Sequence, residues 1–213
     1  MLALPIVQVC AGLALVVTCG VILIGLARRP RLTPPVEVVA AGAPAKGTQF
    51  LWIAGTLVSV LWGVGVFVAP EYAYHWPAFA DFPGSWAVQV LGVALSVSGG
   101  FLFSRAAQTL GKQLTPAIQL RKDHQLIQTG PYRYIRHPVY TAIILVALGG
   151  ALFFLSLPLG ILTILLLGLA FYRARLEEAL LAAPEAFGAT YREYIARTGR
   201  FLPRLRAPRV TSP

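Results

Sequence analysis

The longest uncharged stretch of the chain, PVYTAIILVALGGALFFLSLPLGILTILLLGLAFY, spans residues 138–172. As one continuous helix it would be about 52 Å long, whereas a single bilayer crossing needs about 20 apolar residues. The sequence SLPLG at 156–160 interrupts the stretch, because proline lacks a backbone donor and glycine adopts turn conformations. The stretch therefore predicts two antiparallel transmembrane helices joined by a short turn.

Three more uncharged stretches lie upstream, and each is long enough to cross a bilayer. They span residues 1–27, 47–70 and 82–104. With the two helices of 138–172, they predict an all-α, polytopic integral membrane protein with five transmembrane helices, the fourth and fifth forming a helical hairpin. The composition agrees, since 57% of the 213 residues are apolar and 12% are charged, about half the charge of an average soluble domain.

The charges between these stretches predict the orientation. The net charge of +10 would by itself also suit a nucleic-acid-binding protein. However, the segments 27–49, 105–138 and 173–213 are basic, whereas the segment 70–86 holds two acids and no Lys or Arg. Five crossings place the three basic segments on one side, which the positive-inside bias makes cytoplasmic. We therefore predict an N-terminus outside, a C-terminus in the cytoplasm, the lipid bilayer as partner and no nucleic acid.

The polar segment 105–138 predicts a binding site. Apolar and polar residues alternate around the sequence RKDH at 121–124, which predicts a short surface hairpin between 117–120 and 126–128. Further on, His137 precedes Pro138, and this order favours extended backbone at His137 and a helix that starts at Pro138. Arg136 and His137 would then meet a helix N-terminus, where free amides favour a carboxylate or phosphate.

The predicted hairpin brings distant polar residues to one depth. A turn centred near residues 157 and 158 places His137 level with Glu178. Arg173 and Glu177 share a helix face through their i, i+4 spacing. Each residue alone would also suit a topology anchor or a solvated charge. Together at one depth, they favour a functional site at the cytoplasmic edge of the membrane.

These residues belong to three motifs that follow one another along the chain. The motifs are GPYRYIRHPVY at 130–140, Arg173 with the pair Glu177 and Glu178, and FGATYREYIARTGRFLP at 187–203. They resemble the G-P-Y-x-x-x-R-H-P-x-Y, R-x-x-x-E-E and C-terminal signatures of the isoprenylcysteine carboxyl methyltransferase family and its bacterial relatives. Two features depart from the family pattern: Ala142 stands where glycine is common, and the segment 179–186 is longer.

The resemblance implies a single membrane domain. It covers about residues 87–205, a methyltransferase-like core with a cytoplasmic cofactor site and a cytoplasmic C-terminal helical region. Residues 1–86 would hold two variable transmembrane helices, and residues 206–213 would form a tail.

The family's activity implies a membrane methyltransferase that uses S-adenosylmethionine without the Rossmann fold of soluble methyltransferases. The implied cofactor pocket is lined by Tyr132, Arg136, His137, Pro138, Tyr140, Glu178, Tyr191 and Tyr194. Arg173 and Glu177 would be the catalytic residues and face the acceptor or the transfer centre, and no metal is implied. The expected acceptor is lipophilic, such as the carboxylate of a prenylated thiol, and would enter laterally from the bilayer.

The residue types fit this chemistry. Arg136 and the helix N-terminus suit the methionine carboxylate, and Glu178 suits the ammonium group or a ribose hydroxyl. Arg173 could hold an acceptor carboxylate, which needs no strong base because it is already ionised at neutral pH.

Other functions remain open at this point. Phospholipid amine methylation and a sterol-type reductase that uses NADPH are enzymatic alternatives. A membrane scaffold or a small transporter subunit is the non-enzymatic alternative. A scaffold would not need Arg136, His137 and Glu178 at one depth, and a transporter should show stronger polar groups near the middle of the membrane.

Overall fold

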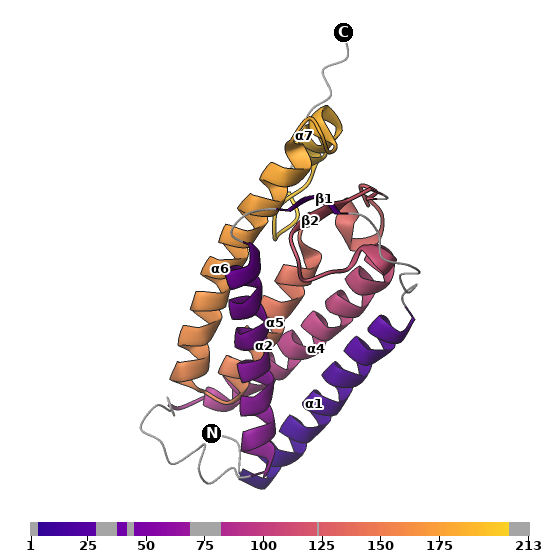
Figure 1. The fold of residues 1–213 in the computed structure, drawn as a ribbon. Coiled ribbons are helices and arrows are strands. Elements are labelled where there is room, and N and C mark those ends of the chain that lie inside the picture. The colour runs from indigo at the N-terminus through magenta and orange to yellow at the C-terminus, as the bar shows by residue number, and fades with distance from the viewer. Residues whose placement is uncertain (1–3, 29–37, 42–44, 69–81, 123, 205–213) are drawn as a thin grey trace.

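The computed structural model describes residues 4–28, 38–41, 45–68, 82–122 and 124–204. The chain is mostly helical, and its long helices lie alongside one another, with α7 and the two short strands gathered at one end (Figure 1). The helices are α1 (Leu4–Ala27), α2 (Ala45–Val68), α4 (Ser85–Leu110), α5 (Pro138–Phe153), α6 (Leu157–Ala182) and α7 (Gly188–Arg197). The strands are β1 (Val38–Ala41) and β2 (Gln119–Arg121), and the 3-10 turns are η1 (Gly111–Gln113) and η2 (Gly130–Arg133).

The lengths and apolar composition of the helices confirm part of the predicted membrane topology. Within the described ranges, three segments are long and apolar enough to cross a bilayer: Gly47–Gly65, Ser85–Gln113 and Leu157–Ala182. The helix α5 is apolar but has 16 residues, fewer than the roughly 20 that a full crossing usually takes. Length and composition thus support three of the five predicted spans.

The predicted interruption of the 138–172 stretch lies between α5 and α6, at residues 154–156. Ser156 is the N-cap of α6 and accepts a hydrogen bond from the backbone of Leu159. Pro158 lies in the first turn of α6, where its missing N–H is not needed. Proline therefore starts the second helix, and the turn comes just before it.

The helices α4 and α5 pack with their backbones in close contact. A Cβ atom on Gly149 would lie 2.5 Å from the carbonyl oxygen of Gly92, and one on Gly99 would lie 2.8 Å from the carbonyl oxygen of Ala142. The buried Gln89 side chain donates to the Phe153 carbonyl at 3.0 Å. A glycine at position 142 would let the backbones of the two helices approach closely. Residue 142 is alanine here, and Gly99 on α4 allows the close approach instead.

The predicted surface hairpin is wrong. The strand β2 pairs antiparallel with β1, whose residues lie between α1 and α2, and the paired residues include Ala41 with Gln119. Alternation correctly indicated extended backbone near 119–121, but periodicity carries no information about which distant segment supplies the partner. The segment 179–186 continues α6 to Ala182 before the chain turns into α7. The tail at 206–213 lies outside the described residues.

A short segment after α7 returns to the start of α5. Gly199 forms a parallel bridge with Ile135. The backbone N–H of Arg136 donates to the Gly199 carbonyl at 2.9 Å, and that of His137 donates to the Arg200 carbonyl at 3.1 Å. We call residues 198–202 the C-terminal strap. These backbone hydrogen bonds hold the strap beside the R-H-P motif at residues 136–138.

Candidate active site

Glu178 is the buried centre of a cluster of ion pairs. Its Oε1 atom accepts from Arg136 Nε at 2.8 Å and lies 3.1 Å from His137 Nε2. His137 is the N-cap of α5, and Glu178 lies near the end of α6. The structure therefore brings Arg136, His137 and Glu178 into direct contact.

Arg136 also binds the last turn of α7. Its Nη1 atom donates to the carbonyl oxygens of Thr198 at 2.5 Å and Ile195 at 3.3 Å. Carbonyls at a helix C-terminus lack intrahelical donors and attract cations. Arg136 therefore connects the start of α5 with the ends of α6 and α7.

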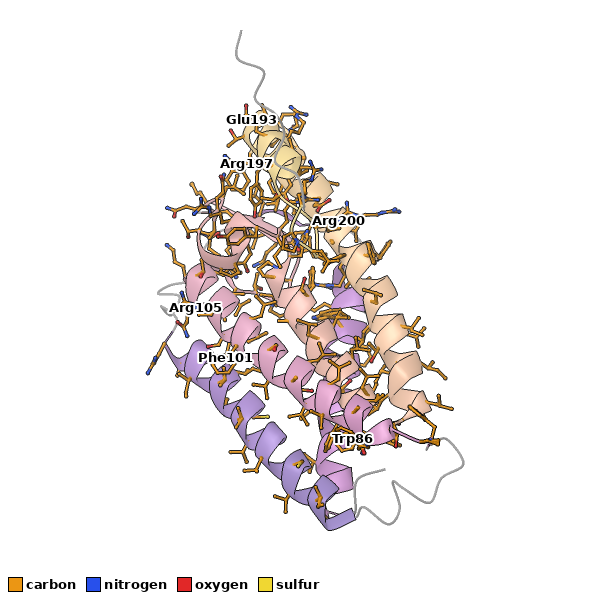
Figure 2. The ribbon with its side chains drawn as sticks, turned by 180° about the vertical axis from the view of Figure 1, so that it is seen from behind. Trp86, Phe101, Arg105, Glu193, Arg197 and Arg200 are labelled. Atoms are coloured by element: carbon orange, nitrogen blue, oxygen red, sulfur yellow. The ribbon has the colours of Figure 1, made fainter. Side chains whose placement is uncertain are left out.

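Arg200, which the sequence did not predict as a site residue, also contacts Glu178. Its Nε atom donates to Glu178 Oε1 at 3.1 Å, and its Nη2 atom donates to Oε2 at 2.5 Å. The hydrogen bonds with Glu178 raise the pKa of the Arg200 guanidinium. Arg200 lies within the third motif, so the signal was present as a basic residue beside Phe201-Leu202-Pro203. Figure 2 shows Arg200 with Arg197 and Glu193 toward the α7 end, with Trp86 at the opposite end.

A second group of side chains surrounds the His137 ring. The ring stacks on Tyr140 with a centroid distance of 5.4 Å, and Phe201 lies 5.8 Å away. The Tyr140 hydroxyl donates to Glu177 Oε2 at 3.1 Å, and His137 Nδ1 lies 3.8 Å from the same oxygen. The structure thus places Glu177 beside the two rings, with Pro138 buried at the first position of α5.

Arg173 is almost completely buried, with 1% of its surface exposed. Its Nη1 atom donates to Thr48 Oγ1 at 3.1 Å, and Nη2 donates to the Pro116 carbonyl at 2.5 Å. Its Nε atom has no hydrogen-bond partner within the described part of the chain. Neither partner was predicted from the sequence, because Thr48 belongs to a helix that the family resemblance implies is variable, and a backbone carbonyl has no sequence signature.

Three predicted tyrosines are buried in the packing around α7. They are Tyr132, Tyr191 and Tyr194. The Tyr194 hydroxyl donates to the Tyr132 carbonyl at 2.7 Å. Burial raises the pKa of Tyr194 to about 12 and also raises the pKa of Tyr132 and Tyr191. The Tyr191 and Tyr194 rings, 5.8 Å apart, pack with Leu120 and Leu181, so they join α7 to α6 and β2.

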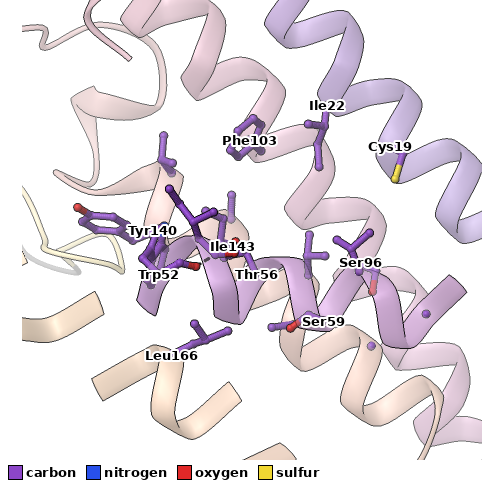
Figure 3. Close-up of a pocket in the computed structure, with 18 of the residues that line it drawn as sticks. Cys19, Ile22, Trp52, Thr56, Ser59, Ser96, Phe103, Tyr140, Ile143 and Leu166 are labelled. Atoms are coloured by element: carbon purple, nitrogen blue, oxygen red, sulfur yellow. Dashed lines mark hydrogen bonds between the residues drawn. The ribbon is translucent and has the colours of Figure 1, made fainter. Parts of the chain in front are cut away.

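An apolar cavity of about 520 Å³ lies next to the cluster, between α1, α2, α4, α5 and α6. Tyr140 and Trp52 lie together at one end of it in Figure 3, with ring centroids 5.0 Å apart, and Arg173 also lines it. The Thr56 hydroxyl in its wall bonds to carbonyls of its own helix, as does that of Ser59. The cavity is therefore apolar along most of its wall, with a buried guanidinium on its lining.

Membrane-length helices, an apolar cavity and buried ion pairs at the helix ends define an integral membrane protein with a polar site beside a lipophilic one. Residues 91–183 match the model of the isoprenylcysteine carboxyl methyltransferase (ICMT) family. This match confirms the resemblance predicted from the sequence, and it includes the first two motifs.

Named relatives agree with the family match. The chain is 27% identical over 127 residues to "Probable protein-S-isoprenylcysteine O-methyltransferase" of Oryza sativa subsp. indica, covering 59% of this chain and 66% of the relative. It is 33% identical over 118 residues to "Protein-S-isoprenylcysteine O-methyltransferase" of Saccharomyces cerevisiae, covering 54% and 48%. The human protein of that name is 28% identical over 137 residues, covering 63% and 47%. The chain thus spans about half to two thirds of the length of these relatives.

Proposed function

We propose that the chain is an S-adenosylmethionine-dependent methyltransferase that acts on a lipophilic acceptor carrying a carboxylate. The observation that carries this proposal is the position of the Arg136–His137–Glu178 cluster beside an apolar cavity lined by Arg173. The names of the similar proteins from rice and yeast support the same class of reaction.

The residues of the cluster fit the amino acid part of this cofactor. A free amino acid end carries one carboxylate and one ammonium group, and the cluster offers the guanidinium groups of Arg136 and Arg200 with the carboxylate of Glu178. When bound, S-adenosylmethionine supplies a methyl group on a positively charged sulfur. The Glu177 carboxylate, beside Tyr140, would favour a positive charge nearby.

Tyr140 and Arg173 would position the acceptor. The Tyr140 ring contacts His137 on one side and Trp52 on the other, so it lies between the cluster and the cavity. Arg173 lines the cavity with a buried Nε–H that has no partner among the described residues, and an acceptor carboxylate would satisfy it. An ionised carboxylate can attack a methyl group without a general base, so positioning and exclusion of water would be the protein's main contributions.

For the membrane topology, we propose five crossings, with the N-terminus outside and the C-terminus and the site on the cytoplasmic side. In this arrangement α5 and α6 form the last hairpin, and their polar ends hold His137 and Glu178. The lipophilic acceptor would enter the cavity from the bilayer, and the water-soluble cofactor would enter from the cytoplasm. A C-terminal reporter found on the outer face would refute this topology.

The cofactor assignment is tested by calorimetry on the full chain in detergent. S-adenosylhomocysteine, the product form of the cofactor, should bind, and NADPH should not. Binding of NADPH alone would favour the reductase alternative. Transfer is then measured with methyl-labelled S-adenosylmethionine and N-acetyl-S-farnesylcysteine, with the same compound amidated at its carboxyl group as the control. Equal labelling of both compounds would contradict a carboxylate acceptor.

A further inference from the structure

The two guanidinium groups that contact Glu178 differ in how firmly the protein holds them. The Arg136 side chain is 6% exposed. It bonds to Glu178 through Nε and to the carbonyls of Ile195 and Thr198 through Nη1. Turning Arg136 toward a ligand would leave buried acceptors without donors, which is costly. Arg136 is therefore a structural connection between three helices.

Arg200 has more freedom. Its side chain is 29% exposed, and its side-chain hydrogen bonds within the described part of the chain all go to Glu178. Its backbone is anchored, because its carbonyl accepts from the His137 N–H in the C-terminal strap. The guanidinium can therefore change partner while the strap stays in place.

We infer that Arg200 binds the carboxylate of the cofactor's amino acid part, and that this carboxylate replaces Glu178 as its partner. The inference rests on the proposed function and deepens it, since the motif resemblance assigns the carboxylate to Arg136. The charges balance in the exchange. The ligand's carboxylate goes to Arg200, its ammonium group goes to Glu178, and Arg136 and His137 stay on Glu178.

The exchange has a physical reason. Separating a partly buried ion pair is unfavourable when either group is left without a counter-charge. A ligand that brings both charges provides a new partner for each, and a guanidinium binds a carboxylate through two parallel hydrogen bonds. A ligand without the amino acid part would leave the Arg200–Glu178 pair intact. The contribution of Arg200 to affinity should therefore depend on whether the ligand carries a carboxylate.

The test compares two ligands by calorimetry. S-adenosylhomocysteine carries the amino acid part, and methylthioadenosine has the same nucleoside thioether without it. Arg200→Gln should weaken S-adenosylhomocysteine about tenfold to a hundredfold, as expected for loss of a charge-assisted bidentate contact. The affinity for methylthioadenosine should stay within about twofold. Arg200→Lys, which keeps the charge without the planar fork, should recover part of the loss.

Arg204→Gln is the matched control, because it removes the same charge from an exposed residue whose guanidinium bonds the Ala196 carbonyl. It should leave both affinities unchanged. Equal weakening of both ligands by Arg200→Gln would show a distorted site and overturn the inference, as would an unchanged affinity for S-adenosylhomocysteine. Failure of the wild-type chain to bind either ligand would instead refute the proposed function on which the inference rests.

Discussion

Replacing Glu178 by glutamine should destabilise the folded protein strongly although the two side chains have the same shape. If the amide oxygen takes the place of Oε1, it can still accept from Arg136 and His137. The amide NH2 then takes the place of Oε2 and faces the Nη2 group of Arg200. Two donors therefore oppose each other where a hydrogen bond forms in the wild-type protein. The negative charge beside the buried Arg136 is lost as well.

The size of the effect follows from the burial of the partners. Removing one member of a buried ion pair costs about 3–5 kcal/mol. Because Arg200 is 29% exposed, water can solvate it and it adds little. We therefore expect the free energy of unfolding to fall by about 3 kcal/mol. At about 2–4 °C per kcal/mol for a chain of this length, the melting temperature should fall by roughly 6–12 °C.

Thermal unfolding in detergent, followed by circular dichroism, measures this effect. Glu193→Gln is the control, because it makes the same charge change at an exposed position on α7. The reasoning is refuted if Glu178→Gln melts within about 1 °C of the control.

Three further predictions follow from buried groups. Arg173→Gln should lower kcat/KM for the farnesylated acceptor at least about tenfold while S-adenosylhomocysteine affinity stays within about twofold; loss of cofactor binding would contradict an acceptor role. Gly149→Ala should destabilise the chain by about 1–3 kcal/mol because its Cβ would overlap α4, whereas Gly168→Ala, with open space around it, should not. Because burial raises the pKa of Tyr194 to about 12, above the roughly 10 of an unfolded chain, stability should fall as pH rises from about 10 to 12. Tyr194→Phe should lessen this pH dependence in thermal melts without abolishing it, because burial also raises the pKa of Tyr132 and Tyr191, and an unchanged dependence would exclude a contribution from Tyr194.

The contacts of the site that could be predicted from the sequence are those that regular helix geometry and local backbone preferences determine. An interrupted apolar stretch places residues before the turn level with residues after it, and His137 and Glu178 do lie in contact. Pro138 does begin α5, as the preference of proline for the first helical position predicts, whereas His137 has φ −121° and ψ 58° and is not extended as predicted. These rules are local, so a single sequence is enough to apply them.

The rest of the site comes from contacts between segments without a common periodic pattern. Thr48 reaches Arg173 from α2, and Arg200 reaches Glu178 from an irregular segment after α7. The partner of β2 was mistaken for the same reason, since β1 lies about eighty residues earlier in the chain. Hydrophobic periodicity predicted which segments are helices, but it carried no information about these long-range pairs.

The C-terminal strap has a consequence for biosynthesis. Arg136 is buried only when Glu178 and the end of α7 surround it, and the strap that completes this arrangement is made long after the R-H-P motif. Because chains grow from the N-terminus, Arg136 and His137 leave the ribosome well before the C-terminal strap is synthesised. A prematurely terminated chain would insert its apolar helices yet leave a guanidinium and a carboxylate without their full set of partners.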